Sequence, residues 1–106
     1  MKQLQLQQGD VLLQETTLPQ GCRKVVVDGH GYVLAKGEAT GHAHIIEGIE
    51  GYEVYERDGI TYISALQDVA LIHEEHNTVT IPVRTWKVGI VEEYDPFTEE
   101  TRQVKD

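Results

Sequence analysis

The stretch YEVYERDGITYI, residues 52–63, decides the fold class of this chain. Two short segments rich in β-branched and aromatic residues flank the pair Asp58-Gly59. Such a pair between two such segments is a strong signal for a β-hairpin, because the tight turn requires backbone with positive φ. Side chains alternate between the two faces of a strand, so Tyr52 and Val54 are predicted to share one face, opposite that of Tyr55.

Short extended segments of the same kind recur on both sides of this hairpin. Glycine, proline or Asp/Asn turn residues separate them, and no window of eleven or more residues shows the 3.6-residue period of a helix. About eight to ten short strands with frequent turns are typical of a small β-barrel or β-sandwich. We therefore predict an all-β fold of short antiparallel strands with little or no helix. Besides the hairpin, the expected strands are 4–8, 11–14, 23–27, 32–36, 42–47, 68–72, 78–81 and 85–91.

The chain of 106 residues is long enough for one hydrophobic core. It contains no internal repeat and no low-complexity linker, so we predict a single all-β domain over residues 1–106. The last residues, 94–106, form an acidic C-terminal segment. We expect this segment to be a solvated tail, with a partner-docking segment as the alternative, and residues 97–105 to form either a short helix or an irregular end.

Charge and composition exclude several classes of protein. Nine Lys and Arg against 18 Asp and Glu give a net charge of −9. The cations are scattered along the chain, which argues against a nucleic-acid partner. The sequence has no apolar stretch of membrane-spanning length and no signal peptide, and Cys22 is its one cysteine. We expect a cytoplasmic protein with no membrane partner and no internal disulfide.

Four of the five histidines occur as two close pairs. His42 and His44 form an H-x-H pair within an expected strand, and His73 and His76 bound the segment HEEH at the end of another. Residues i and i+2 of a strand point to the same face, so the first two imidazoles are expected to lie together. The i, i+3 spacing of HEEH and the lack of a helix around it argue against a zinc-protease motif.

These residues predict a metal site if the two segments lie side by side. The candidate ligands are His42, His44, His73, His76 and Glu47. Imidazole and carboxylate ligands of this kind suit a divalent transition metal such as Zn, Fe, Ni or Mn. Such a site is also expected to bind or act on a small molecule.

Part of this pattern resembles a known family. The spacing Gly37-x4-His42-x-His44-x2-Glu47 is similar to the first metal-binding motif of the cupins, one residue shorter before the first His and one before the Glu. The resemblance implies a small β-barrel with His42, His44 and Glu47 as metal ligands. The second cupin motif is broken: its Pro corresponds to Pro82, but Lys87 stands where the last ligand His is expected. The segments GEATGHAH, LIHEEH, TIP and EEYDP also resemble a small bacterial or phage-associated family of unknown function.

Three functions from different classes remain open at this stage. The first is a metal-binding β-barrel protein. The second is a non-enzymatic structural or interaction module, such as a phage-associated or homo-oligomeric assembly protein, with surface histidines. The third is a pH-tuned binding protein whose histidines act as charge switches. No acid, base and nucleophile constellation is present, so we favour a binder over an enzyme, and we expect a homo-oligomer formed by pairing of edge strands.

Overall fold

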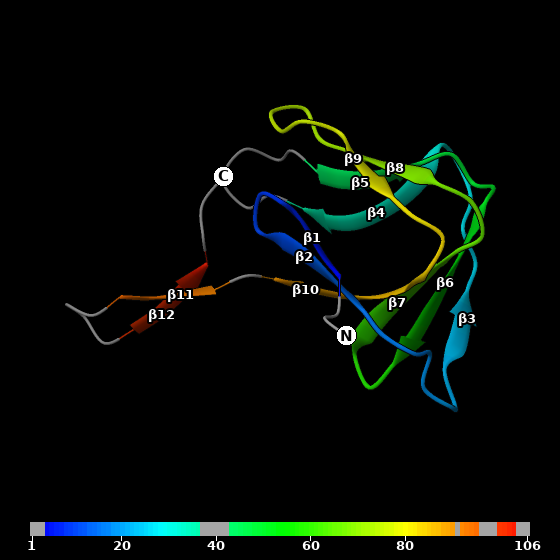
Figure 1. Cartoon of the computed structure of the whole chain (residues 1–106), viewed down its shortest axis with the longest axis horizontal. Coiled ribbons are helices and arrows are strands. Elements are labelled where there is room, and N and C mark those ends of the chain that lie inside the picture. Colours follow the sequence, from blue (N-terminus) through cyan, green and yellow to red (C-terminus); the bar gives the residue numbers. More distant parts are fainter. Residues whose placement is uncertain (1–3, 37–42, 91, 96–99, 104–106) are drawn as a thin grey trace.

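The computed structural model describes residues 4–36, 43–90, 92–95 and 100–103, and every regular element in these ranges is a β-strand. Figure 1 shows how the strands are arranged. Their bounds are β1 (Gln5–Gln8), β2 (Val11–Glu15), β3 (Arg23–Val25), β4 (Gly31–Lys36), β5 (Ala43–Glu47), β6 (Tyr52–Arg57), β7 (Ile60–Ala65), β8 (Val69–Ile72), β9 (Val79–Ile81), β10 (Thr85–Ile90), β11 (Glu92–Asp95) and β12 (Glu100–Gln103).

The strands form two main antiparallel sheets. One sheet has six strands in the order β1-β2-β10-β7-β6-β3, and the other has four in the order β4-β5-β8-β9. Strands β11 and β12 pair with each other as a separate hairpin. The predicted all-β fold is thus confirmed. Of the two architectures expected, the structure has open sheets with edge strands and not a closed barrel.

The β6–β7 hairpin has the turn that its sequence predicts. Arg57 pairs with Ile60, so the loop consists of two residues, Asp58 and Gly59. Their φ values are +52° and +77°, which is the conformation of a type I′ turn. This turn twists in the same sense as the strands that it joins, which explains why a short Asp-Gly loop sets the register of the whole hairpin.

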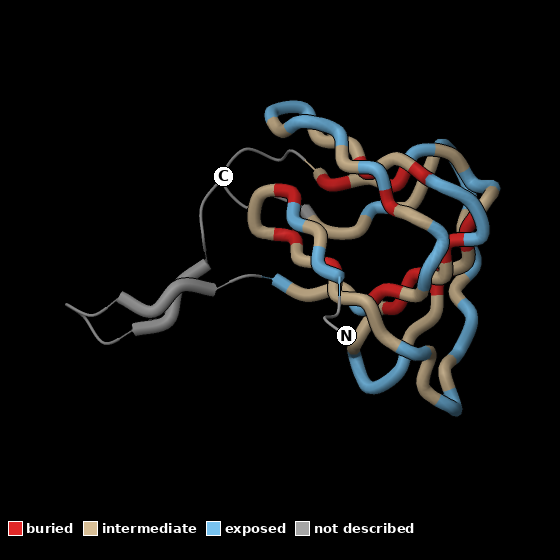
Figure 2. The backbone as a smooth tube through the Cα atoms, in the orientation of Figure 1, coloured by how far each residue is buried: buried red, intermediate tan, exposed pale blue. Residues whose placement is uncertain are grey.

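The core lies between the inner faces of the two sheets, where the buried segments in Figure 2 gather. Tyr52 and Val54 are both buried and Tyr55 lies on the outer face, as the alternation predicts. Trp86 of β10 is fully buried, and its indole Nε1 donates to the carbonyl oxygen of Pro82 at 3.1 Å. Pairing its one polar atom in this way allows a large aromatic side chain to fill the interior without a desolvation penalty.

Several expected boundaries differ from the structure. Strand β3 ends at Val25, two residues earlier than predicted. Neither the tail nor the alternative of a short helix at 97–105 is right for residues 100–103, which form β12, and residues 96–99 and 104–106 lie outside the described ranges. No helix of the length and hydrophobicity needed to cross a membrane occurs in the part of the chain that the structure describes.

Candidate functional site

His44 lies on the inner face of β5, between the two sheets. The side chains of this strand alternate, so His44 and Ile46 are buried whereas Glu47 is exposed. Only 1% of the His44 surface is accessible. A buried imidazole needs hydrogen-bond partners, because an unpaired polar group in the interior costs about 1–3 kcal/mol. The partners of His44 therefore define the site.

Gln8, the last residue of β1, is one of these partners. Its Oε1 lies 2.9 Å from His44 Nδ1, and its Nε2 donates to the carbonyl oxygens of Leu71 and Asn77 at 2.8 Å and 2.9 Å. The two carbonyls use both hydrogens of Nε2, so the amide oxygen is the atom that faces the ring. Because an amide oxygen can only accept, the hydrogen-bond network places a proton on His44 Nδ1. Gln8 thus joins the two sheets and fixes the tautomer of His44.

Asp10 faces the other nitrogen of the same ring. It lies in the turn between β1 and β2, and its Oδ1 is 3.3 Å from His44 Nε2. With a proton on Nδ1, the neutral ring directs a lone pair from Nε2 toward a carboxylate, and the two repel each other. A proton or a metal ion bound between them replaces this repulsion with attraction. His44 and Asp10 therefore form a position that favours a cation.

Two further imidazoles meet His44 at this end of the molecule. Ile45 pairs with Ile72 in the β5–β8 ladder, so the next step of an antiparallel register sets His44 opposite His73. The ring centroids of His44 and His73 are 4.4 Å apart. His76, which follows in the β8–β9 connection, lies 4.7 Å from His73 and 6.0 Å from His44 by the same measure.

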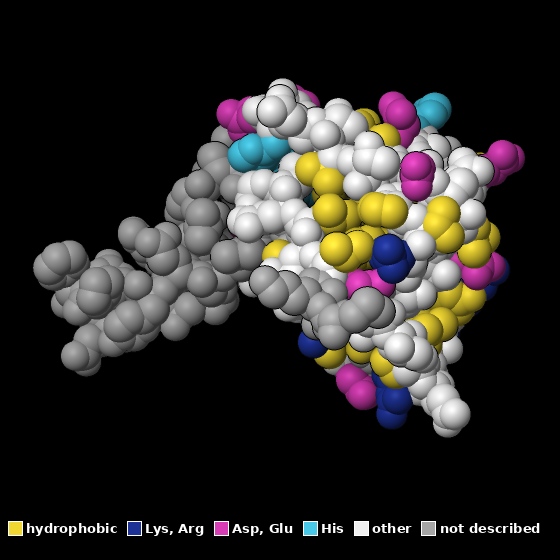
Figure 3. All heavy atoms as spheres, viewed as in Figure 1, with side chains coloured by type: hydrophobic (Ala, Val, Ile, Leu, Met, Phe, Trp, Pro, Cys, Tyr) yellow, Lys and Arg dark blue, Asp and Glu magenta, His cyan; other side chains and the backbone are white. Residues whose placement is uncertain are grey.

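The connection between β8 and β9 carries this part of the site to the surface. His73 and His76 are only partly buried, and Glu74 and Glu75 between them are exposed. His73 Nδ1 accepts a hydrogen bond from the backbone N–H of Glu75 at 3.0 Å, which holds the ring in place. Figure 3 shows histidine and acidic side chains together at this end of the molecule. The site therefore has a buried part, around His44, and a part open to solvent.

The spacing of the three rings is close to that of imidazoles on one metal ion. A metal–nitrogen bond of about 2.0 Å in tetrahedral geometry sets ring centroids roughly 5 Å apart, and the observed separations of 4.4, 4.7 and 6.0 Å bracket that value. The rings, however, contact one another partly through their faces: His44 and His76 are stacked, with 13° between their planes. As the side chains stand, no group of three or more His, Cys, Asp or Glu residues among the described ones is placed to hold a metal ion. Binding requires His73 to give up its hydrogen bond from the Glu75 backbone N–H, and both His73 and His76 to turn.

The five predicted ligands have different outcomes. The structure brings His44, His73 and His76 together. It does not bring Glu47 to them, because the alternation of β5 directs this side chain to the opposite face of the strand. His42 lies outside the described residues.

Gln8 and Asp10 are site residues that sequence reasoning missed. In the sequence they stand in LQLQQGD, a polar strand followed by a turn, where Gln7 and Gln8 differ only in their phase of the alternation. Both residues reach His44 only through the packing of β1 and its turn against the other sheet. A glutamine in the apolar phase of an alternating strand, such as position 8 after Leu4 and Leu6, is the one signal that predicts burial.

Comparisons with known proteins place the chain in a family. The model of the family described as "Domain of unknown function (DUF8820)" matches residues 7–90, so the chain belongs to this family. The match agrees with the predicted resemblance to an uncharacterised family and gives no support to the resemblance to cupins. No curated protein and no solved structure matches the chain.

Proposed function

We propose that this member of the DUF8820 family binds a divalent transition metal ion through His44, His73 and His76, with the carboxylate of Asp10 as a fourth ligand. The observation that carries the proposal is the arrangement around His44. One nitrogen of a buried ring is held by Gln8 and the other faces a carboxylate at 3.3 Å. A proton or a metal ion completes such a pair, and the proximity of the His73 and His76 rings favours the metal ion.

The role of Gln8 is the one expected of a residue that positions a metal ligand. Metal-bound histidines almost always donate their other N–H to an oxygen atom, which fixes both the tautomer and the ring orientation. Here Gln8 Oε1 accepts from Nδ1, which directs Nε2 of His44 toward Asp10, where the proposed ion would bind. Loss of such a partner typically weakens metal binding by about 10–100-fold.

The proposed ligands come from three parts of the chain. His44 lies on β5, Asp10 lies in the β1–β2 turn, and the other two histidines lie at the β8–β9 connection. An ion held by all of them cross-links the two sheets and stabilises the folded state, because the unfolded chain does not hold these groups together. Three imidazoles and one carboxylate suit Zn, Fe, Ni or Mn.

A hollow lies on the outer face of the β5–β8 pair, beside the start of the connection that carries His73. This hollow of about 250 Å³ adjoins His73, and its other walls are Ala43, Ile45, Ile72 and Glu74. Its lining is mainly apolar with one carboxylate. Ala43 and Ile45 lie on the face of β5 opposite to His44, so this hollow lies across the strand from the proposed ion. The other interpretation, an interaction module with surface histidines, is weaker because His44 is buried.

The test is metal binding by untagged protein. We expect about one equivalent of metal per chain by elemental mass spectrometry, saturable binding of Zn²⁺ by calorimetry, and a melting temperature that falls when a chelator is added. Binding that stays linear in metal concentration, with no change in melting temperature, would contradict the proposal.

Variants separate the proposed site from nonspecific binding by an acidic protein. Asp10→Asn keeps the size of the side chain and removes the charge, and His76→Ala removes a ring from an exposed connection; we expect each to weaken Zn²⁺ binding by about 10–100-fold. The matched control is His30→Ala, which removes an exposed histidine from the turn before β4. If the control weakens binding as much as the other two variants, the cluster is not the site.

A further inference from the structure

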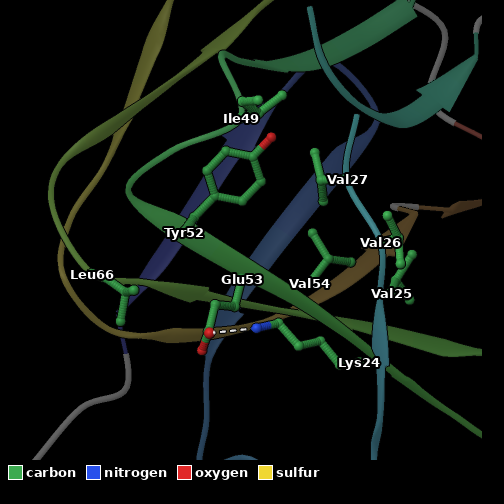
Figure 4. Close-up of a pocket in the computed structure, with 9 residues that line it drawn as sticks. All are labelled: Lys24, Val25, Val26, Val27, Ile49, Tyr52, Glu53, Val54 and Leu66. Atoms are coloured by element: carbon green, nitrogen blue, oxygen red, sulfur yellow. Dashed lines mark hydrogen bonds and ion pairs between the residues drawn. The ribbon is translucent and has the colours of Figure 1, made fainter. Parts of the chain in front are cut away.

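A groove opens where β3 separates from β6. The ladder between these strands ends at the pair Val25–Val54, and beyond Val25 the chain leaves the sheet. The groove has a volume of about 460 Å³, and its walls are mostly apolar, with Val27 and Ile49 among them (Figure 4). This feature lies on the six-stranded sheet and is separate from the histidine cluster.

The strand that borders the groove is an edge strand. β3 is the last strand of its sheet, and in the part of the chain that the structure describes no strand pairs with its outer side. Large apolar side chains beside it are open to solvent: Val26 is 86% exposed, Leu66 60% and Ile49 48%. An open edge with exposed apolar side chains favours pairing with a further strand.

Beyond the end of β3 at Val25, residues 26–28 belong to no strand, but exposed and half-buried positions continue to alternate along them. Lys24, Val26 and Asp28 are exposed, whereas Val25 and Val27 are half-buried. In an antiparallel pair related by a two-fold axis perpendicular to the sheet, residues opposite each other must point to the same face. Pairing centred on Val26 meets this condition.

We propose that two copies of the chain pair antiparallel along residues 24–28, with Val26 of one copy opposite the partner's Val26. Val25 then lies opposite the partner's Val27, so both half-buried positions match. Lys24 lies opposite the partner's Asp28, and the two-fold axis repeats this pair of opposite charges. One five-residue segment therefore supplies both halves of a complementary contact, which identifies the occupant of the edge as a second copy of this chain.

Charge favours this edge over the rest of the surface. The chain has a net charge of −9, so two copies repel each other over most approaches. At this edge, however, Lys24 Nζ lies 2.8 Å from Glu53 Oε2, and Arg23 forms an ion pair with Glu56. The local charge is thus almost balanced, which lowers the repulsion between two copies that approach at this edge.

A cysteine at position 26 tests the register. In a Cys22→Ser background, Val26→Cys places two thiols directly opposite each other, within the distance that a disulfide spans. We expect rapid formation of a covalent dimer with a mild oxidant. The matched control is Val83→Cys, a 57% exposed valine between β9 and β10. Equal cross-linking of both variants would overturn the proposal.

Sedimentation velocity of the unmodified chain, combined with charge reversal, tests the ion pairs. We expect a monomer–dimer equilibrium that Asp28→Lys alone weakens by about tenfold. Adding Lys24→Asp restores part of the affinity, because the opposite charges face each other again while the Lys24–Glu53 ion pair within each copy is lost. Rescue distinguishes the contact from a general loss of fold, since each variant also remains testable for folding by circular dichroism. A monomer at all concentrations, or a dimer insensitive to Asp28→Lys and to Val26→Asp, would contradict the pairing.

Discussion

The chemical character of His44 comes from residues far away in the sequence. Gln8 is 36 positions from it and Asp10 is 34, yet these two side chains face its two ring nitrogens. The same glutamine amide donates to the carbonyl oxygens of Leu71 and Asn77, so it connects strand β1 with β8 and with the far end of the β8–β9 connection. A single buried amide therefore supports the position of the histidine and of the connection that carries the other two rings.

Replacement of Gln8 should therefore lower the stability of the protein more than the loss of one surface glutamine would. In Gln8→Leu, two carbonyl oxygens and His44 Nδ1 lose their partner in the interior, and we expect the free energy of unfolding to fall by about 2–4 kcal/mol. Urea unfolding measures this change. Gln7→Leu is the control on the same strand, because the Gln7 side chain is exposed and bonds only locally to the Gly9 carbonyl. A similar loss in both variants would show that the Gln8 network is not the cause.

At the level of elements, the sequence predicts the local hairpins but does not predict which distant strands pair. The Asp58-Gly59 turn and the alternation around it predicted the β6–β7 hairpin, because the conformation of a two-residue turn depends on those residues alone. The sequence predicts a metal site only if β5 and β8 lie side by side, and it does not predict that they pair. This pairing depends on sheet order, which no single strand encodes, and for the same reason Gln8 and Asp10 could not be assigned to the site.

The β4–β5 pair shows how closely the strand bearing His44 is packed. Gly31 of β4 lies opposite Glu47, and a Cβ atom added to it would overlap the carbonyl oxygen of Ile46. Gly31→Ala must therefore move β4 away from β5, and we expect a loss of about 1–3 kcal/mol of stability, measured by thermal unfolding. Gly89→Ala on β10 is the matched control, since a Cβ atom there meets open space. An unchanged melting temperature for Gly31→Ala would refute this account of the packing.

For the whole molecule, an excess of acidic groups makes stability depend on pH. Several carboxylates are held by partners across strands, and Glu15 is an example: its Oε1 accepts from the Leu4 backbone N–H at 3.2 Å and its Oε2 from Arg84 at 2.7 Å. The hydrogen bond from Leu4, and then Arg84, lower the pKa of this carboxyl below its ordinary value of 4.5. The hydrogen bond from Lys24 likewise lowers the pKa of Glu53.

These lowered pKa values fix the sign of the pH dependence. Because the unfolded chain binds a proton at Glu15 more readily than the folded one, the stabilisation is complete above the ordinary pKa of 4.5 and is lost as the pH falls through the lower folded value. Glu15→Gln should therefore lower the urea midpoint at neutral pH and have a much smaller effect in strong acid. Glu50→Gln, which changes an exposed carboxylate between β5 and β6, controls for net charge. If both variants lose the same stability at every pH, the overall charge and not the Leu4–Glu15–Arg84 contact governs acid unfolding.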